Sequence, residues 1–357
     1  MSVHDFLNTS PAWMKESGPE SDIVVSTRIR IARNLARYPF CTLLTDSDAE
    51  KIVEEARRAL KSPDMRQVGR FELFRSWELS DVERQVFVEK HLISPALAEE
   101  ARRGAFAVSS DESVSIMINE EDHLRIQCIV PGFQVRHAWQ LASLVDDILE
   151  SKLDYAFHEK YGYLTSCPTN VGTGIRASVM MHLPGLVLTQ QINRILSAIS
   201  QVGLVVRGLY GEGSDAIGNL FQISNQITLG QSEEEILENL QGVVKQILEH
   251  ERAARKQLLR DNREALEDRI WRSYGILAYA RKIESKEAMQ RLSDVKLGID
   301  LGTIKGVSAG ILKELMVMTR PAILQKLTGK ELAPGERDWR RAAIIRERLR
   351  SDSASVS

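Results

Sequence analysis

A short segment near the start of the chain, IVVSTRIRI at residues 23–31, alternates two kinds of side chain at every second position. That period is typical of a β-strand, whose successive residues face opposite sides of a sheet. One face would be largely apolar, formed by Val25, Thr27, Ile29 and Ile31. The other would carry Ser26, Arg28 and Arg30. Buried arginines are costly unless they meet an anion, so the segment predicts an anionic partner, although a solvated edge strand would also accommodate it.

The composition limits the classes of protein to which this chain can belong. Its 357 residues are enough for two domains, and 47 basic side chains nearly balance 49 acidic ones. This balance argues against a nucleic-acid-binding protein. The three cysteines, Cys41, Cys128 and Cys167, are few and odd in number, which indicates a reducing compartment. The N-terminal segment has no long apolar run, so we expect a cytoplasmic protein without a signal peptide or membrane span.

The order of the predicted elements divides the chain into two domains. Up to about residue 230, strand-like segments alternate with amphipathic helices, and the remaining chain is mostly helical. Ser47 with Glu50, and Ser232 with Glu235, form capping-box patterns that open two of the helices. We therefore expect an α+β domain over residues 1–255 and a small all-α domain over residues 256–357.

Polar side chains are concentrated in residues 106–130, which predict a β-hairpin with its turn near Asp111 and Glu112. On the second strand, alternation would gather five polar residues on one face: Asn119, Glu121, His123, Arg125 and Gln127. Glu120 and Asp122 would interrupt the apolar face opposite. A carboxylate close to a histidine and an arginine suits a site that handles charge. The polar outer face of an antiparallel sheet would show the same alternation, so both interpretations remain open.

The segment CPTNVGTGIRASV, residues 167–179, places a thiol beside a proline and two glycines one residue apart. Glycines permit backbone conformations and close approaches that side chains block, and here they would leave room for a ligand. Cys167 is chemically useful only where its surroundings stabilise the thiolate. The alternative is a glycine-rich turn in which Cys167 is a small buried apolar residue.

Five arginines stand at strand or loop-edge positions: Arg28, Arg30, Arg125, Arg176 and Arg207. Arginine suits phosphate because its guanidinium is planar and stays charged. The chain contains no GxxxxGK[ST], GxGxxG or HExxH motif, so a nucleotide would have to be held by these side chains. Glu121 and Glu212 are left as carboxylates that could hold a cation, whereas His91, alone near the end of a helix, would usually be structural.

Four blocks of sequence together resemble the ATP:guanidino phosphotransferases, the family of the phosphagen kinases and the bacterial protein arginine kinases. The blocks are STRIR (26–30), NEEDHLR (119–125), CPTNVGTGIRASV (167–179) and RGLYGE (207–212), in the order of the family. The resemblance covers roughly residues 20–255. It implies an α+β catalytic domain like that of phosphagen kinases and glutamine synthetase, with an antiparallel β-sheet flanked by helices. It also implies ATP and Mg²⁺ as cofactors, the metal being carried by ATP.

The same resemblance implies roles for individual residues. The five arginines would clamp the ATP phosphates, and His91, in EKHL, would contact the nucleotide. Glu121 and Glu212 would grip the substrate guanidinium, one of them as the base, and Cys167 would contact that guanidinium. The implied ATP-binding positions are Val24, Val25, Ser26, Thr27, Arg28, Arg30, His91, Arg125, Arg176, Ala177, Ser178, Val179, Met180, Arg207, Gly208, Leu209, Tyr210 and Gly211.

Two features distinguish the chain from the small-molecule kinases of the family. Met180 stands where those kinases usually have a histidine, which leaves the nucleotide contact at this position open. Those kinases also carry a helical domain before STRIR that closes over the small substrate, whereas here STRIR begins at residue 26 and the extra residues lie at the C-terminus. A site without that lid would admit an arginine side chain of a protein, as the resemblance to the protein arginine kinases implies.

The segment RDWRRA near the C-terminus resembles the phosphoarginine-binding motif of the same subfamily. It consists of Arg337, Asp338, Trp339, Arg340, Arg341 and Ala342. Its arginines would take the phosphate and Asp338 the guanidinium, which implies a regulatory or docking pocket. Without the resemblance, the segment is typical of a solvated, charged helix face.

The leading functional hypothesis is an ATP-dependent kinase of arginine side chains in proteins. The partners that the resemblance implies are proteins with exposed arginines, an activator protein, a Clp protease unfoldase, a stress-gene repressor as substrate, and a second copy in a homodimer. The alternatives are a phosphoarginine-binding adaptor with a secondary kinase activity and a small-molecule arginine kinase. Direct binding of nucleic acid through the arginine-rich C-terminal segment is disfavoured by the acidic residues interleaved there.

Overall fold

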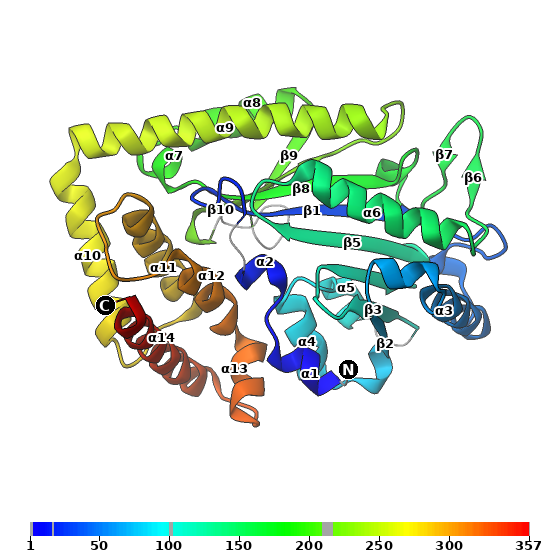
Figure 1. The fold of residues 1–357 in the computed structure, drawn as a ribbon, viewed down its shortest axis with the longest axis horizontal. Helices are drawn as coiled ribbons and strands as arrows, with labels where there is room; N and C mark the ends of the chain where they lie inside the picture. Colours follow the sequence, from blue (N-terminus) through cyan, green and yellow to red (C-terminus); the bar gives the residue numbers. More distant parts are fainter. Residues whose placement is uncertain (1–2, 16–17, 100–102, 209–216, 357) are drawn as a thin grey trace.

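The computed structural model describes residues 3–15, 18–99, 103–208 and 217–356 (Figure 1). Within these residues, an eight-stranded antiparallel sheet has the strand order β2-β3-β4-β5-β1-β8-β10-β9. Its strands are β1 (Val24–Arg33), β2 (Phe71–Arg75), β3 (Ala105–Ser109), β4 (Val114–Ile118), β5 (Leu124–Pro131), β8 (Ile175–His182), β9 (Leu204–Gly208) and β10 (Leu220–Asn225). A separate ribbon pairs β6 (Phe157–His158) with β7 (Gly162–Tyr163). The predicted α+β class with an antiparallel sheet is confirmed.

One face of the sheet is covered by a layer of helices that shares a single hydrophobic core with it (Figure 1). Ile29 and Ile31 of β1 lie in this core, as the alternation of residues 23–31 predicts. The helices are α3 (Asp46–Leu60), α6 (Val135–Glu150), α7 (Pro184–Leu188), α8 (Ile192–Gln201) and α9 (Glu233–Asp261). The capping box of Ser232 and Glu235 at the start of α9 is confirmed, but α3 is capped by Thr45 and not by Ser47.

The opposite face of the sheet is covered at its two ends by different groups of helices (Figure 1). Near one end, Phe74, Phe106 and Met117 pack with α1 (Val3–Asn8), α4 (Asp81–Glu89) and α5 (Pro95–Glu99). At the other end lie α2 (Ala12–Lys15), α10 (Arg263–Tyr279), α11 (Ser285–Asp300), α12 (Ala309–Met318), α13 (Pro321–Thr328) and α14 (Pro334–Val356). We call α10 to α14 the helical domain. Polar side chains occupy the part of this face that lies between the two groups.

Two local predictions about the strands are wrong. The predicted turn near Asp111 and Glu112 is confirmed between β3 and β4, but residues 106–130 do not form one hairpin: a second turn at residues 119–123 divides the predicted second strand into β4 and β5. Asn119 begins this turn with φ +55°, and therefore Glu121 and His123 do not continue the strand face of Arg125. In β1, the register shifts between Val24 and Ser26, and Val25 consequently joins the core of the helical domain.

The boundary between the domains lies close to one long helix. Helix α9 runs without a break through residue 255, and α10 begins at Arg263. The division into residues 1–255 and 256–357 remains a prediction. Among the described residues, no helix combines the length and apolar character needed to cross a membrane.

Candidate active site

The register of the sheet brings the predicted arginines onto one face. Arg30 of β1 pairs directly with Arg176 of β8 and with Gln127 of β5. Opposed residues of antiparallel strands point to the same side. Arg28 precedes Arg30 by two residues and Arg125 precedes Gln127 by two, so they share that side as well.

Arg207 reaches the same face from the edge strand β9. It pairs with Gln222 of β10, which in turn pairs with Met180 of β8, and Met180 pairs with Ser26 of β1. A direct hydrogen bond crosses the same strands, because Arg28 Nη2 donates to Gln222 Oε1 at 2.8 Å. We call the five side chains the arginine face: Arg28, Arg30, Arg125, Arg176 and Arg207.

The arginine face is electrostatically strained as it stands. Burial, reinforced by the neighbouring charges of Arg125 and Arg176, lowers the pKa of Arg28 to about 10. The pKa of Arg30 is likewise lowered well below its usual value, mainly by burial and then by the charge of Arg28. Within the described part of the chain, the buried Nε–H of Arg30 has no acceptor. Clustered, buried guanidinium groups of this kind require a strongly anionic ligand, and a polyphosphate has the necessary charge and acceptor oxygens.

A cavity of about 730 Å³ lies against this face. On the side of the sheet it is lined by Arg28, Arg30, Arg207 and Gly208, all of them predicted nucleotide ligands. The volume is within the range of pockets that enclose nucleotide-sized ligands. Predicted positions Leu209, Tyr210, Gly211 and Glu212 lie outside the described residues.

His91 also lines this cavity, although a lone histidine would usually be structural. It follows α4 with φ +62°, and its carbonyl oxygen accepts a hydrogen bond from Gln127 Nε2 at 2.8 Å. Burial, with smaller contributions from Arg28 and Arg320, lowers the pKa of His91 to about 3. The imidazole is therefore neutral at physiological pH and can act as a hydrogen-bond donor or acceptor without adding charge.

The remaining predicted nucleotide positions on β1 and β8 fall into three groups. Ser26, Ser178 and Met180 line a small cavity next to Arg28 and His91. Val25 and Met180 pack in the core of the helical domain, so Met180 serves apolar packing. The other side chains point to the opposite face of the sheet. Val24, Ala177 and Val179 lie in the hydrophobic core that the sheet shares with its helix layer, and the hydroxyl of Thr27 donates a hydrogen bond to the carbonyl of Gly132 at 2.6 Å.

The turn at residues 119–123 places carboxylates next to the arginine face. Arg125 donates from Nη1 to Glu120 at 2.5 Å and from Nη2 to Glu121 at 3.2 Å. The Glu120 side chain is 5% exposed and also accepts a hydrogen bond from Ser94, whereas that of Glu121 is 39% exposed. Burial raises the pKa of Glu121, although Arg125 opposes the shift. The sequence pattern missed Glu120, because it placed this residue among the apolar positions of a continuous strand.

Asp122 and Asn34 connect the acidic turn to the segment that carries the thiol. Asp122 accepts hydrogen bonds from the side chain of Asn34 and from the backbone N–H of Ser166, each at 2.7 Å. His123 has a structural role, because its Nδ1 accepts from the N–H of Leu35 and its Nε2 bonds to a backbone carbonyl. Cys167, next to Ser166, is thereby held close to the turn.

The glycine-rich segment differs from its expected role. Cys167 is half-buried, and its Sγ lies 3.0 Å from Thr169 Oγ1. Gly172 and Gly174 both have positive φ, but a Cβ at Gly172 would lie 2.8 Å from the carbonyl oxygen of Thr228. A Cβ at Gly174 would lie 2.6 Å from that of Ala32. The two glycines therefore make room for the protein's own backbone and not for a ligand.

The RDWRRA segment lies in the first half of α14. Arg341 is almost completely buried and donates to the carbonyls of Thr319 and Ile283 and to Asp338 Oδ1, at 2.9, 2.9 and 2.6 Å. Ala342 is buried in the core of the helical domain. The exposed residue of the motif is Trp339, and Arg337 and Arg340 are half-buried.

Metal-binding residues are not clustered in the described ranges, where no group of three or more His, Cys, Asp and Glu side chains is placed to hold an ion.

Comparisons with known proteins place these features in a family. Residues 51–254 match the ATP:guanido phosphotransferase C-terminal catalytic domain, and residues 263–357 match the protein-arginine kinase McsB C-terminal domain. The chain is 60% identical over 351 residues to a protein-arginine kinase of Brevibacillus brevis, covering 98% of both chains. It is also 60% identical over 356 residues to a protein-arginine kinase of Halalkalibacterium halodurans, covering 99% of this chain and 100% of the relative.

The fold is similar to that of solved guanidino kinases. A lombricine kinase superposes with a TM-score of 0.56 at 22% identity, over 69% of this chain and 71% of that one. The duplicated taurocyamine kinase of Schistosoma mansoni gives 0.57 at 24% identity, over 69% and 36%. These likenesses concern the fold, whereas the family models and the full-length relatives concern the sequence itself. The chain belongs to the protein-arginine kinases of the ATP:guanido phosphotransferase family.

Proposed function

We propose that this chain transfers the γ-phosphate of ATP to the guanidinium of arginine side chains in proteins. The observation that carries the proposal is the position of Arg125, which belongs to the arginine face and is bonded to Glu120 and Glu121. A phosphate held by the arginines and an acceptor guanidinium held by Glu121 would be neighbours. Few other reactions need an anion site and a cation site in contact.

The chemistry follows from this juxtaposition. A nitrogen of the acceptor guanidinium would form a bond to the γ-phosphorus while the bond from that phosphorus to the bridging oxygen of ADP breaks. Glu121 would accept the proton that the nitrogen loses, and its raised pKa suits a general base. The arginine face would neutralise the charge on the phosphates, and Mg²⁺ bound to ATP would add to that neutralisation.

Family resemblance supports further assignments that extend this proposal. Glu212 would be the second carboxylate on the acceptor, and Cys167 would contact the same guanidinium. The other predicted nucleotide positions would surround ATP, with backbone contacts where the side chains point away. The enzyme would act in the cytoplasm as a homodimer and phosphorylate proteins with exposed arginines, among them a stress-gene repressor. An activator protein and delivery to a Clp protease unfoldase would complete this stress response.

A second, regulatory function is supported by RDWRRA. Arg337 and Arg340 of this motif are half-buried on one helix, next to the exposed Trp339. A phosphoarginine bound there would make the chain an adaptor for already phosphorylated proteins, or an enzyme regulated by its product. The adaptor function predicts that partner delivery survives the loss of kinase activity.

The experiment is to incubate the full chain with ATP, Mg²⁺ and an unfolded protein, and to map phosphoarginine by mass spectrometry under conditions that preserve the P–N bond. Arg125→Gln should reduce phosphoarginine formation by roughly a hundredfold, since it removes a cation at the developing charge. Arg136→Gln is the matched control, because Arg136 forms exposed ion pairs with Glu234 and Glu238. If free arginine is added to the reaction and phosphate appears only on it and not on the protein, the proposal is rejected in favour of a small-molecule kinase.

A further inference from the structure

Two domains enclose the cavity beside the arginine face. The catalytic sheet supplies Arg28, Arg30 and Arg207. The helical domain supplies residues near the start of α11 and at the junction between α12 and α13: Ser285, Lys286, Met289, Arg320 and Pro321. A ligand that fills the cavity would therefore touch residues far outside the catalytic region.

One end of the cavity adjoins the acidic turn. It is lined by Ser94, whose hydroxyl donates to Glu120 Oε1 at 2.6 Å, and by Met117, which pairs with Arg125 across β4 and β5. Because the acceptor guanidinium would be held at Glu121, the phosphate that is transferred must lie at this end.

The other end of the cavity is lined by Gly208, Ile217 and the first turn of α11. ATP is an elongated molecule with its γ-phosphate at one terminus, so its ribose and base must extend away from the acidic turn. Ile217 offers apolar surface to a purine, and the almost fully buried Met289 lines the cavity beside it. The hydroxyl of Ser285 and the ammonium of Lys286 can hydrogen-bond to ribose hydroxyls and ring nitrogens.

We propose that the helical domain forms part of the ATP site, in which Ser285, Lys286 and Met289 of α11 contact the ribose and the base. This inference rests on the proposed function, because that function places the γ-phosphate at the acidic turn. Nucleotide binding then depends on both domains, and the five arginines account only for the phosphates.

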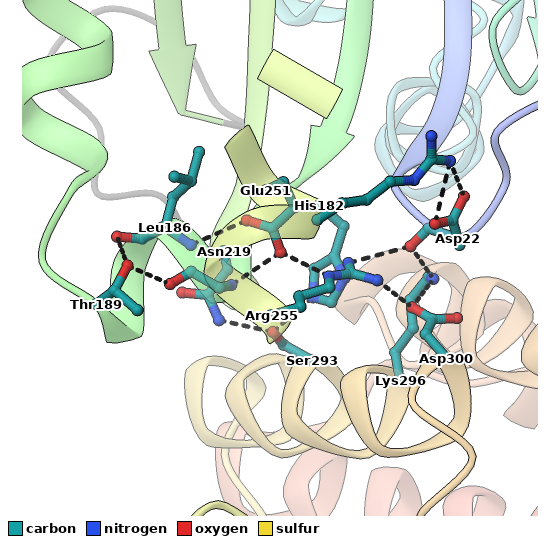
Figure 2. Close-up of polar contacts among 12 residues, drawn as sticks. Asp22, His182, Leu186, Thr189, Asn219, Glu251, Arg255, Ser293, Lys296 and Asp300 are labelled. Carbon is teal, nitrogen blue, oxygen red and sulfur yellow. Dashed lines mark hydrogen bonds and ion pairs between the residues drawn. The ribbon is translucent and has the colours of Figure 1, made fainter. Parts of the chain in front are cut away.

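Close packing fixes α11 against the sheet. The short turn Ile217–Asn219 carries Gly218 with φ +67°, and a Cβ there would lie 3.0 Å from the carbonyl oxygen of Met289. One turn further along α11, Ser293 Oγ accepts a hydrogen bond from Asn219 Nδ2 at 2.7 Å and lies 2.8 Å from His182 Nε2 (Figure 2). The residues of α11 that face the cavity are thus held by neighbours on the same helix.

Buried charges fix the rest of α11. Lys296 Nζ donates to Asp300 Oδ2 at 2.7 Å and to the carbonyl of Asp22 at 3.0 Å. Arg255 of α9 lies 3.6 Å from the same Asp300 oxygen and donates to Glu251 at 2.7 Å (Figure 2). These groups join α9, α11 and the segment before β1, so the helical domain is a fixed wall of the cavity.

A second attachment lies on the other side of the cavity. Glu89, which lines it, accepts hydrogen bonds from the backbone N–H groups of Ala322 and Ile323 at the start of α13, both at 2.9 Å. Arg320, one residue before α13, also lines the cavity. The wall is therefore anchored at both sides, which favours a binding role over a loose lid.

The test measures binding of ATP and of AMP to the full chain by calorimetry, with AMP as the probe for the nucleoside half. In Ser285→Ala and Lys286→Ala, the dissociation constants for ATP and for AMP should both rise by the same factor, roughly three- to tenfold. Lys305→Ala, an exposed lysine of the same domain that does not line the cavity, is the control and should change neither constant.

The outcomes separate this inference from the proposed function. The inference would be overturned if the dissociation constants of both nucleotides were unchanged. It would also be overturned if only ATP bound more weakly, because Lys286 would then contact the phosphates. If the unsubstituted chain binds both nucleotides but forms no phosphoarginine, the proposed function fails, while the binding comparison still decides the role of α11. Thermal unfolding of each variant shows whether a change in affinity reflects a change in folding.

Discussion

Asp122 Oδ1 accepts a hydrogen bond from the backbone N–H of Ser166 at 2.7 Å, and this bond joins the acidic turn to the segment that carries Cys167. The same oxygen accepts from Asn34 Nδ2, and Asn34 also donates to the carbonyl of Leu164 at 3.0 Å. A buried residue with no proposed contact to substrate thus sets the spacing between Glu121 and Cys167, two residues proposed to touch it.

Replacing Asp122 should therefore impair catalysis more than nucleotide binding. In Asp122→Ala the two segments lose their shared acceptor, and we expect kcat to fall by about 10- to 100-fold with the KM for ATP nearly unchanged. Asp122→Asn keeps one acceptor oxygen and should recover much of the rate. Asp261→Asn, at an exposed aspartate paired only with Arg260 among the described residues, is the control. Equal losses in kcat for the Ala and Asn variants would show that charge, not spacing, is what Asp122 provides.

Glu121 should determine how the rate depends on pH. Burial raises its pKa, and a general base works only when deprotonated, so the rate should fall as the pH drops through a value above that of an ordinary glutamate. Glu121→Gln should lose roughly 10²- to 10⁴-fold in kcat and lack this acidic limb. Glu249→Gln, on the exposed surface of α9, should keep the normal profile. An unchanged acidic limb in Glu121→Gln would assign the base to another residue.

His91 should make the folded protein sensitive to acid. Its pKa is lowered to about 3 by burial, whereas a histidine in the unfolded chain titrates near 6.5. The unfolded state therefore binds the extra proton first, and stability is lost as the pH falls from 6.5 towards 3. Between pH 7 and pH 5 this loss is at most about 2 kcal/mol.

The check is urea unfolding of the wild-type chain and of His91→Asn at both pH values. Asparagine tolerates the positive φ of this position, so the variant isolates the imidazole. The variant should lose less stability than the wild type between pH 7 and pH 5. An identical loss in both proteins would mean that the imidazole does not titrate differently on folding.

The sequence predicted the parts of the site that depend on local periodicity. Alternation on β1 placed Arg28 and Arg30 on one face, because successive residues of a strand alternate whatever their partners are. It failed at Val25, where a register shift that depends on pairing with β8 inverts the pattern. The alternation pattern also failed at residues 119–123. The turn there begins at Asn119 with positive φ and contains no glycine or proline, the residues that most clearly signal a turn.

Other features of the site depend on tertiary contacts and could not be predicted from the sequence pattern. The wall that α11 contributes to the cavity depends on the docking of the helical domain through Ser293 and Lys296, which no local pattern encodes. The role of Glu120 has the same origin, because only the turn brings it to Arg125. Burial of Met180 in the core of the helical domain likewise requires that domain to be in place.

The glycines after Cys167 should be needed for packing. Gly174→Ala would place a Cβ 2.6 Å from both the Ala32 carbonyl oxygen and Arg33 Nη1, in addition to straining a φ of +67°. We expect the free energy of unfolding to fall by about 2–4 kcal/mol, measured by urea denaturation. Gly230→Ala is a matched control, with a φ of +80° but no atom within 4 Å of its Cβ, and should cost only about 1 kcal/mol. Equal losses would show that backbone strain alone, without the close approach, explains the glycine at position 174.

Arg337 and Arg341 of RDWRRA lie one helical turn apart. Replacing Arg341 should mainly reduce stability, whereas replacing Arg337 should mainly weaken ligand binding. Arg341 donates to the carbonyls of Thr319 and Ile283, so Arg341→Ala leaves buried acceptors unpaired and should cost about 3 kcal/mol of stability. Among the described residues, Arg337 donates a longer bond to the carbonyl of Leu332, at 3.3 Å, and Arg337→Ala should cost at most about 0.5 kcal/mol.

If the motif binds phosphoarginine, Arg337→Ala should still weaken binding of a phosphoarginine peptide by roughly tenfold or more, because it removes a charged partner of the phosphate. Urea unfolding together with fluorescence titration of a labelled peptide measures both quantities on the same proteins. A stable Arg341→Ala variant that has lost peptide binding would reverse the assignment. Arg341 would then serve the ligand, and not the attachment of α14 to the segment before α11 and to the end of α12.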